Sequence, residues 1–161
     1  MGTKLTASKL SAKYDNGERD FSGFNLEGVD LSGAYLSGAD LHGAKLYGAD
    51  LSYANLSDAD LSGADLRRVE LYAVDLHNAN LSGADLSDAD LRGVDLRGIN
   101  FSKTRLYKVD LSFADLRDTD LSDADLTGAN LYRANIAGAK LGDWKVERGE
   151  DEGMARRKKV K

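Results

Sequence analysis

Residues 36–66 read LSGADLHGAKLYGADLSYANLSDADLSGADL, in which a leucine returns at every fifth position. The same spacing runs without an insertion from Phe21 to Leu141, which gives 25 repeat centres in a chain of 161 residues. Only Phe21, Phe101 and Ile136 replace leucine at a centre. A regular short period of this length predicts a repeat architecture in which each unit packs on its neighbours.

The positions around each centre are restricted as well. The residue two before the centre is Ala, Val, Ile or Phe in 22 of the 25 repeats, and the residue directly before it is Asp or Asn in 20. The residue two after the centre supplies 12 of the 17 glycines, and the chain contains no proline. Each unit of five therefore tends to offer two apolar positions, one acidic or amide position and one small position.

A period of five fits neither an α-helix nor a flat strand. On a helix each leucine would lie about 140° from the last, and on a strand successive leucines would face opposite sides. The leucines share one interior only if the chain turns a corner once per repeat, so we expect a coil whose turns stack about 4.8 Å apart. Glycine then serves the corners, and Asp or Asn can accept a hydrogen bond from a turn amide. Proline is absent because it would remove a ladder donor.

Units such as ADLHG (39–43), ADLSG (59–63) and ADLSD (84–88) resemble the A(D/N)LXX units of pentapeptide-repeat proteins. The resemblance covers residues 19 to about 146. It implies an all-β fold, a right-handed quadrilateral parallel β-helix (a solenoid) with four repeats per coil. The 25 repeats would then form about six coils and a rod about 30 Å long. It also implies a bacterial, often cyanobacterial, protein, and we expect a cytoplasmic one.

The segment 1–18 is expected to cap the N-terminal end of the rod. Ala7, Leu10 and Tyr14 have helical spacing, Thr6 can cap the start of a short helix, and Gly17 can end it. This helix would lie over the first coil.

The β-helix is expected to occupy residues 19–146, with Trp144 and Val146 as a terminal plug. Residues 147–161 are charged and nearly without apolar side chains, so we expect a disordered tail. The whole chain has a formal net charge of −5. It has no apolar run near the ~18 residues of a membrane span, so no transmembrane segment is expected.

Catalytic and metal chemistry is not expected. The chain has no cysteine, which excludes a disulfide framework and a cysteine nucleophile. Residues 58–63 begin like a calcium-binding loop, but Val69 stands at the twelfth position, where that motif needs Glu. His42 would lie between Ser22 and Ser62, and neither it nor His77 gains an evident nucleophile with an orienting carboxylate. We therefore predict no enzyme, no cofactor, no metal and no small-molecule substrate.

A candidate protein-binding face appears when residues 20 apart are stacked. One column would carry exposed aromatic and arginine side chains where the repeat prefers small residues, with cation–π contacts between Tyr72 and Arg92 and between Phe113 and Arg133. The alternative is that these side chains only support adjacent coils. A second departure places Lys103, Thr104, Arg105 and Lys108 at positions that prefer Gly, Ala and Asp, either as a local contact site or as variation at exposed positions. The candidate binding residues are Tyr53, Tyr72, Arg92, Phe113, Tyr132 and Arg133.

Two functions remain open. The leading one is a non-enzymatic structural or protein-interaction module with an unspecified protein partner, no direct nucleic-acid binding, and a monomeric or weakly end-to-end associated state. The alternative, taken from a branch of the family, is a DNA mimic that binds and modulates DNA gyrase. Acidic columns such as Asp75, Asp95 and Asp115 favour the mimic, whereas Arg97 and Arg117 interrupt the negative field that it needs. The tail also lacks the apolar residues of a dimerising helix.

Overall fold

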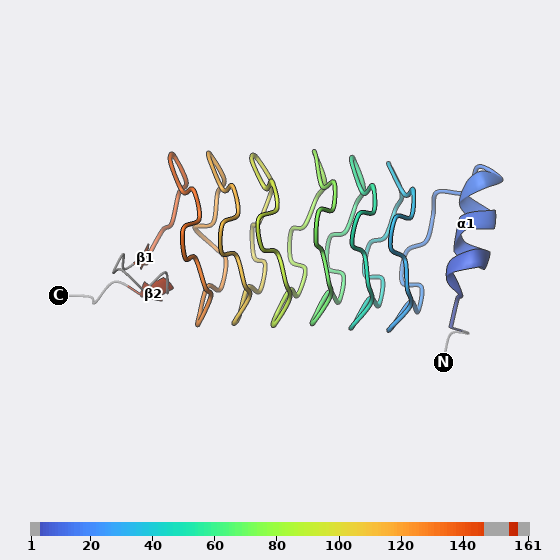
Figure 1. Ribbon diagram of the computed structural model, residues 1–161, viewed down its shortest axis with the longest axis horizontal. Coiled ribbons are helices and arrows are strands. Elements are labelled where there is room, and N and C mark those ends of the chain that lie inside the picture. The colour runs from blue at the N-terminus through green and yellow to red at the C-terminus, as the bar shows by residue number, and fades with distance from the viewer. Residues whose placement is uncertain (1–3, 147–154, 158–161) are drawn as a thin grey trace.

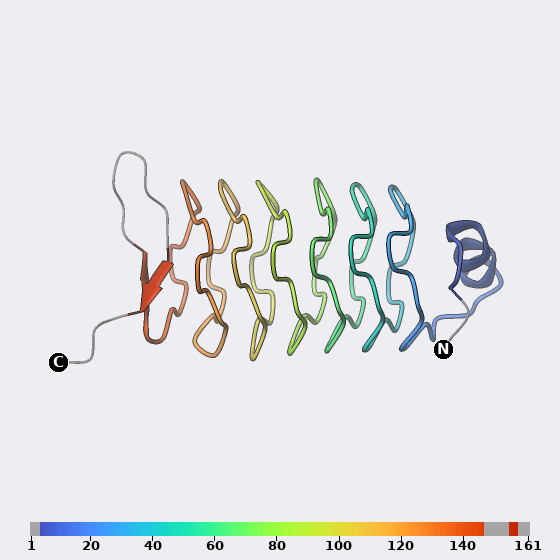
Figure 2. The same cartoon turned by 90° about the horizontal axis from the view of Figure 1, so that it is seen from below.

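The computed structural model describes residues 4–146 and 155–157. These residues form a rod, with helix α1 (Ala7–Asp15) across one end and the strands β1 (Trp144–Val146) and β2 (Ala155–Arg157) at the other (Figure 1). Between these elements the chain winds as a coil whose turns are joined by single-residue parallel bridges (Figure 2). No helix in the described ranges is long and apolar enough to cross a membrane.

Each coil contains 20 residues, because the bridges join residues 20 apart. Asp20 pairs with Asp40, and Asp40 pairs with Asp60. In a typical ladder bond, the amide of Leu46 donates to the carbonyl of Asp65 at 2.8 Å. Four repeats therefore complete one coil, as the family resemblance implied, and side chains at equal positions stack in columns along the rod.

A β-turn forms each corner. In one example the amide of Ala44 donates to the carbonyl of Leu41 at 2.9 Å, and Gly43, the third residue of the turn, has a φ of +60°. This left-handed conformation favours glycine, as the sequence predicted. Eleven other residues nevertheless adopt it at the same turn position, with φ between 52 and 62°. Glycine is thus the least costly corner residue and not a required one.

The acidic position directly before each centre stabilises the next turn. Asp60 Oδ1 accepts a hydrogen bond from the amide of Ser62 at 2.9 Å, and Asp110 Oδ1 accepts one from the amide of Ser112 at 2.9 Å. The hydroxyl of Ser62 also bonds the Asp60 carboxylate, and these bonds lower the pKa of Asp60. The prediction that Asp and Asn bind turn amides is confirmed.

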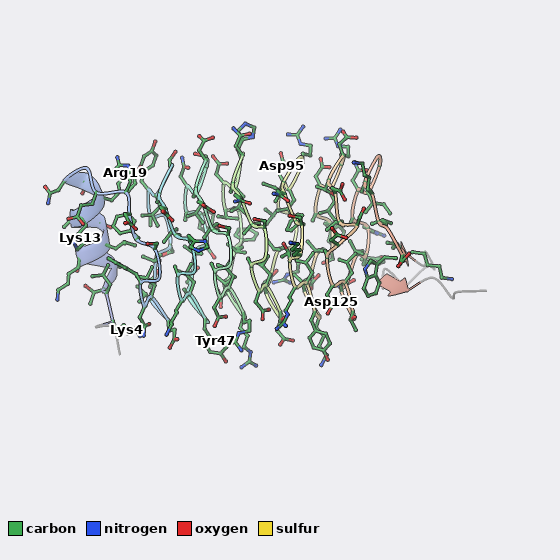
Figure 3. The ribbon with its side chains drawn as sticks, turned by 180° about the vertical axis from the view of Figure 1, so that it is seen from behind. Lys4, Lys13, Arg19, Tyr47, Asp95 and Asp125 are labelled. Atoms are coloured by element: carbon green, nitrogen blue, oxygen red, sulfur yellow. The ribbon has the colours of Figure 1, made fainter. Side chains whose placement is uncertain are left out.

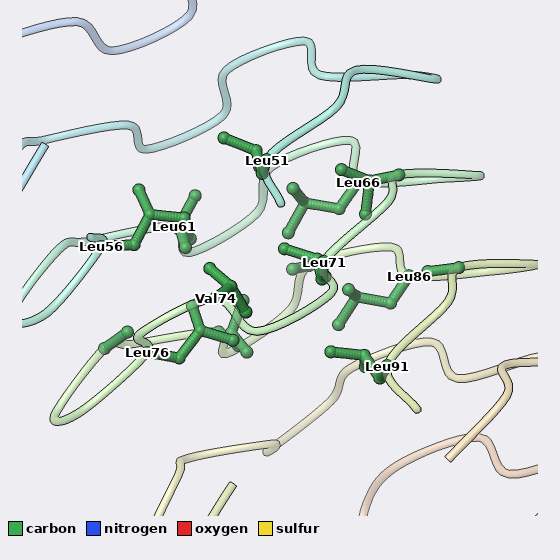
Figure 4. Packing of buried hydrophobic residues seen from close by; sticks show 14 of the residues in the cluster. Leu51, Leu56, Leu61, Leu66, Leu71, Val74, Leu76, Leu86 and Leu91 are labelled. Atoms are coloured by element: carbon green, nitrogen blue, oxygen red, sulfur yellow. The ribbon is translucent and has the colours of Figure 1, made fainter. Parts of the chain in front are cut away.

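The repeat centres and the residues two before them fill the interior of the rod (Figure 4). Leu61 and Ala59 are buried, as are the stacked leucines of the neighbouring coils. Two threonines occupy positions where the repeat prefers Ala. The hydroxyl of Thr104 donates to the carbonyl of Leu81 at 2.9 Å, and that of Thr119 donates to a carbonyl of its own turn. The leucine columns therefore form a continuous core without many aromatic residues.

Helix α1 covers the first coil. Thr6 Oγ1 accepts a hydrogen bond from the amide of Lys9 at 3.4 Å and so caps the helix start. Leu10 and Tyr14 face the rod and are buried, and the Tyr14 hydroxyl donates to the carbonyl of Ser37 at 2.8 Å. The helix therefore shields the end of the leucine columns from water.

The C-terminal end carries a two-stranded antiparallel sheet. Trp144 pairs with Arg157, and Val146 pairs with Ala155. The Trp144 indole is buried and its Nε1–H donates to the carbonyl of Ala124 at 3.0 Å. The expected disorder of residues 147–161 does not describe Ala155–Arg157, which form β2. The rest of that segment lies outside the described residues.

The hydrogen-bond ladder is interrupted near the middle of the rod. Within the described part of the chain, four successive amides do not form the ladder bond to the carbonyl nineteen residues later, those of Ala73, Leu76, Asn78 and Leu81, and the next coil lacks three such bonds, at Gly98, Phe101 and Lys103. The bridge expected between Asp75 and Asp95 is also missing. The two coils concerned lie farther apart than their neighbours in both views (Figures 1 and 2). We call this interruption the breach.

Oversized core residues explain the breach. Val74 and Val94 stack in one interior column in which the neighbouring coils carry Ala54 and Ala114. Ile99 follows in the next wall, where the preceding coil has Ala. Coils about 4.8 Å apart accommodate alanine more easily than two stacked β-branched side chains, so the wall opens. The opening forms a cavity of about 290 Å³ whose lining includes Val74, Ile99 and Arg97.

Candidate protein-interaction ridge

One corner column carries all six candidate binding residues. The wall before this corner pairs in register from Asp50 through Glu70, Asp90 and Asp110 to Asn130, so the turns that follow it stack on one another. The amides of Tyr53, Gly93 and Phe113 then donate to carbonyls of the next coil. We call the ten turn residues of these five coils the corner ridge, and they are Ser52, Tyr53, Tyr72, Ala73, Arg92, Gly93, Ser112, Phe113, Tyr132 and Arg133.

Two aromatic pairs stand on the corner ridge. Tyr53 and Tyr72 meet edge to face with ring centroids 5.4 Å apart and an interplanar angle of 82°. Phe113 and Tyr132 repeat the arrangement at 5.7 Å and 88°. Tyr53, Tyr72 and Phe113 are 64%, 59% and 55% exposed, so each pair offers ring surface to solvent. Tyr53 and Phe113 hold the same turn position three coils apart, which is about 14 Å along the rod.

The two arginines of the corner ridge behave differently. Arg133 lies over both rings of the second pair, 5.9 Å from the centroid of Phe113 and 5.1 Å from that of Tyr132, so the expected cation–π contact with Phe113 forms. The prediction of a contact between Arg92 and Tyr72 is wrong. The Arg92 guanidinium instead binds Asp90, with Nε 2.9 Å from Oδ1 and Nη2 2.6 Å from Oδ2. A two-pronged charged pair within one turn is stronger than an exposed cation–π contact.

The ridge aromatics are held in an unfavourable backbone conformation. Tyr53 has a φ of +61° and Phe113 a φ of +62°, in the left-handed region that bulky residues rarely adopt. This conformation costs an L-residue about 1–2 kcal/mol relative to the right-handed one. Glycine serves the same turn position at twelve other corners. The two aromatics therefore stand where a less costly residue would fold equally well.

Negative charge lies on one side of the corner ridge. Asp30, Asp50, Glu70, Asp90 and Asp110 follow one another in bridging register, about 4.8 Å apart. Among the described residues the Glu70 side chain forms no hydrogen bond or ion pair, and only Asp90 is matched by an arginine. Hydrogen bonds from Arg92 hold the pKa of Asp90 below its ordinary value. We call these five residues the acidic column.

The wall on the other side of the ridge is largely neutralised. Arg97 binds Asp95 at 2.6 Å and Arg117 binds Asp115 at 2.7 Å. These hydrogen bonds lower the pKa values of both carboxyl groups. The ridge thus has an acidic side and a nearly neutral side. Figure 3 shows Tyr47, which belongs to another corner, on the opposite edge of the rod from Asp95.

The family model for pentapeptide repeats matches eight copies, over residues 20–52, 49–88, 84–123 and 110–143. The chain belongs to the pentapeptide-repeat family. Comparison with curated protein sequences finds no match.

Solved pentapeptide-repeat structures resemble the chain. Rfr23 from the cyanobacterium Cyanothece 51142 is 28% identical with a TM-score of 0.41, over 83% of this chain and 94% of Rfr23. HetL from Nostoc sp. strain PCC 7120, involved in regulation of heterocyst differentiation, is 26% identical with a TM-score of 0.32, over 86% and 94%. A protein of the Arabidopsis thaliana thylakoid lumen is 31% identical with a TM-score of 0.28, over 78% and 72%.

The pentapeptide coil also brings a histidine to a serine. His42 Nδ1 lies 2.9 Å from Ser62 Oγ, one of the two serines that the residue spacing places beside it. Within the described residues no carboxylate hydrogen-bonds to the His42 ring. The amide of Ser62 is bonded to Asp60 and that of Gly63 to Ser82, which leaves no free donor to stabilise an oxyanion there. The pair therefore lacks the groups that activate a serine.

The remaining polar clusters do not form sites. Thr104 is buried, and Arg105 lies 3.7 Å from Asp85, so the basic departure around Lys103 and Lys108 is divided between the core and two corners. Across the described residues, no group of three or more histidine or acidic side chains could hold a metal ion.

Proposed function

We propose that this pentapeptide-repeat chain is a non-enzymatic module that binds another protein along the corner ridge. The scaffold is the right-handed quadrilateral β-helix that the family resemblance implies. The observation that carries the proposal is the presence of two exposed aromatic pairs at one corner, with Tyr53 and Phe113 both in the left-handed conformation. Exposed aromatic rings and arginines are enriched at protein interfaces.

Side chains that only supported adjacent coils would not need to be these aromatic residues. Corners with glycine form the same turn and the same bonds between coils, as at Gly43 and Gly63. A ladder contact between neighbouring rings contributes about 0.5–1.5 kcal/mol, which is no larger than the cost of the left-handed backbone. Tyr53 and Phe113 therefore bring little net stability, and a binding role accounts for their presence at the same corner.

The charge pattern favours a protein partner over mimicry of DNA. A DNA mimic needs a continuous negative field, whereas arginines bind the carboxylates of Asp65, Asp95 and Asp115. The acidic column is confined to one side of one corner. The charge pattern therefore does not support the gyrase-binding alternative.

Affinity capture from a lysate of the source organism tests the proposal. The ridge variant replaces four aromatic residues by serine. The control variant replaces by serine two tyrosines at another corner, which are 37% and 39% exposed. The substitutions are Tyr53→Ser, Tyr72→Ser, Phe113→Ser and Tyr132→Ser in the first, and Tyr47→Ser and Tyr107→Ser in the second.

A partner should be lost with the ridge variant and kept with the control. Circular dichroism and thermal unfolding establish that both variants fold. A third variant, Tyr53→Gly with Phe113→Gly, keeps the left-handed corners at no backbone cost and should lose the partner as well. Partners that all survive the ridge and glycine variants would refute the proposal.

A further inference from the structure

We infer that the partner segment is an extended, cationic peptide that lies along the rod axis, with two apolar side chains four residues apart. One apolar side chain would contact the Tyr53–Tyr72 pair and the other the Phe113–Tyr132 pair. Lysine or arginine residues of the peptide would face the acidic column. This inference rests on the proposed function and specifies the chemistry of its partner.

The spacing of the aromatic pairs sets the peptide geometry. Tyr53 and Phe113 are 60 residues apart at equivalent positions, hence three coils, or about 14 Å along the wall that keeps its bridges past the breach. An extended chain rises about 3.4 Å per residue, so four residues span about 14 Å. Because side chains alternate in an extended chain, residues four apart lie on the same face and can contact both pairs.

The charge of the ridge sets the peptide composition. Glu70 lies in register between Asp50 and Asp90, and like charges at this spacing repel one another. Asp50 and Glu70 are next to the first aromatic pair, and Asp110 directly precedes the turn of the second. Within the described residues Arg92 is the one arginine paired with the acidic column, and Arg133 adds a second positive charge beside the second aromatic pair, which leaves acidic groups in excess. A cationic segment relieves this repulsion, whereas an acidic peptide or a nucleic acid backbone would be repelled.

Synthetic peptides test the geometry and the charge separately. The probe is Ser-Leu-Ser-Lys-Ser-Leu-Ser-Lys, with leucines four residues apart and lysines on the same face. An isomer of the same composition, Ser-Leu-Leu-Lys-Ser-Ser-Ser-Lys, changes only the leucine spacing, and Ser-Leu-Ser-Glu-Ser-Leu-Ser-Glu changes the charge. Binding to the full chain is followed by NMR chemical shifts, which detect weak association. A longer basic helical peptide with leucines about 14 Å apart tests the helical alternative.

The probe should bind at least about tenfold more tightly than the isomer, and the acidic peptide should not bind. The ridge variant should weaken binding of the probe by more than about tenfold, and the control variant should not. Tighter binding of the isomer, the acidic peptide or the helical peptide would overturn the inference, as would no binding of the probe.

Charge substitutions separate this inference from the proposed function. Asp50→Asn with Glu70→Gln keeps the turn hydrogen bond of Asp50, because an amide oxygen also accepts it, and removes two charges from the acidic column. Asp40→Asn with Asp60→Asn removes two charges from another wall. The first pair of substitutions should weaken binding of the probe about three- to tenfold and reduce the salt dependence of that binding. The second pair should change neither.

Capture of the natural partner shows whether the cationic-peptide inference or the proposed function itself has failed. A partner lost with the ridge variant but unaffected by Asp50→Asn with Glu70→Gln and by high salt would overturn the cationic peptide while leaving the proposed function intact. A partner that survives the ridge variant refutes the proposed function itself.

Discussion

The corners of the rod allow one residue type to be tested in two backbone conformations. Asp88 and Asp123 both occupy the third position of a corner turn and both are exposed. Asp88 has a φ of +58°, whereas Asp123 is the only such residue from position 23 to 138 without a left-handed φ. Within the described residues neither side chain forms a hydrogen bond or salt bridge. Asp88→Gly and Asp123→Gly therefore remove the same charge and differ mainly in the backbone that they replace, because the charge of Arg68 that acts on Asp88 has a small effect between exposed groups.

Two effects determine the free energy of unfolding of these variants. Glycine raises the entropy of the unfolded chain, which destabilises both by about 0.4–1 kcal/mol. Only Asp88→Gly also relieves a left-handed backbone, which is worth about 1 kcal/mol because Asp tolerates this conformation better than most residues. Asp123→Gly should therefore lose stability, and Asp88→Gly should be unchanged or gain. Because the unfolded-state effect cancels between the variants, the difference between their free energies of unfolding should be about 1 kcal/mol.

Urea denaturation followed by circular dichroism measures this difference. The slope of the free energy against urea should be the same in both variants, so the midpoints report stability directly. In thermal unfolding the midpoints of the two variants should differ by roughly 2–4 °C. Equal losses of stability in the two variants would refute the account of the corners, and so would a larger loss in Asp88→Gly.

Three further predictions concern the breach, the cap and the charges. In hydrogen exchange, the amides of Leu76 and Asn78 should exchange at least about fivefold faster than that of Leu96, which keeps its ladder bond, and equal rates would argue against a breach. Tyr14→Phe removes the hydrogen bond to Ser37 and should lower the free energy of unfolding by about 0.5–1.5 kcal/mol in a urea titration, whereas no loss would show that the hydroxyl does not hold the cap. Arginine hydrogen bonds lower the pKa values of four carboxyl groups, so their contribution is complete above the unfolded value near 3.8 and is lost as the pH falls through the lower folded values. Urea midpoints should therefore be flat from about pH 7 to 5 and fall below about pH 4, and a rise on acidification would contradict the sign; the groups are Asp65, Asp90, Asp95 and Asp115.

Much of the fold follows from the repeat alone. The period of five predicts a coil with leucine and alanine inside, and the carboxylate of Asp60 bonds the turn as its position indicates. The number of repeats per coil needed the family resemblance, because periodicity does not determine how many corners close a turn. The stacking of the six ridge residues then follows from residue spacing.

Other features depend on side-chain competition that the repeat pattern does not express. Arg92 was expected near Tyr72, but a carboxylate two residues before it in the chain, that of Asp90, binds the guanidinium first. The breach had a signal in the sequence, because Val74 and Val94 share an interior column, but its effect depends on how the coils respond to the added volume. The strain at Tyr53 is likewise a property of the folded turn and is not visible in composition.

Photo-crosslinking tests the interaction ridge most directly. Arg92 lies between the two aromatic pairs, and Arg97 occupies the same turn position at the next corner, each bound to the aspartate two residues before it. A photoreactive phenylalanine derivative is placed at position 92 in one protein and at position 97 in another, and both are irradiated with a native lysate. The account predicts a cross-linked partner from position 92 and little or none from position 97. Equal products from both positions, or a product from position 97 alone, would contradict it.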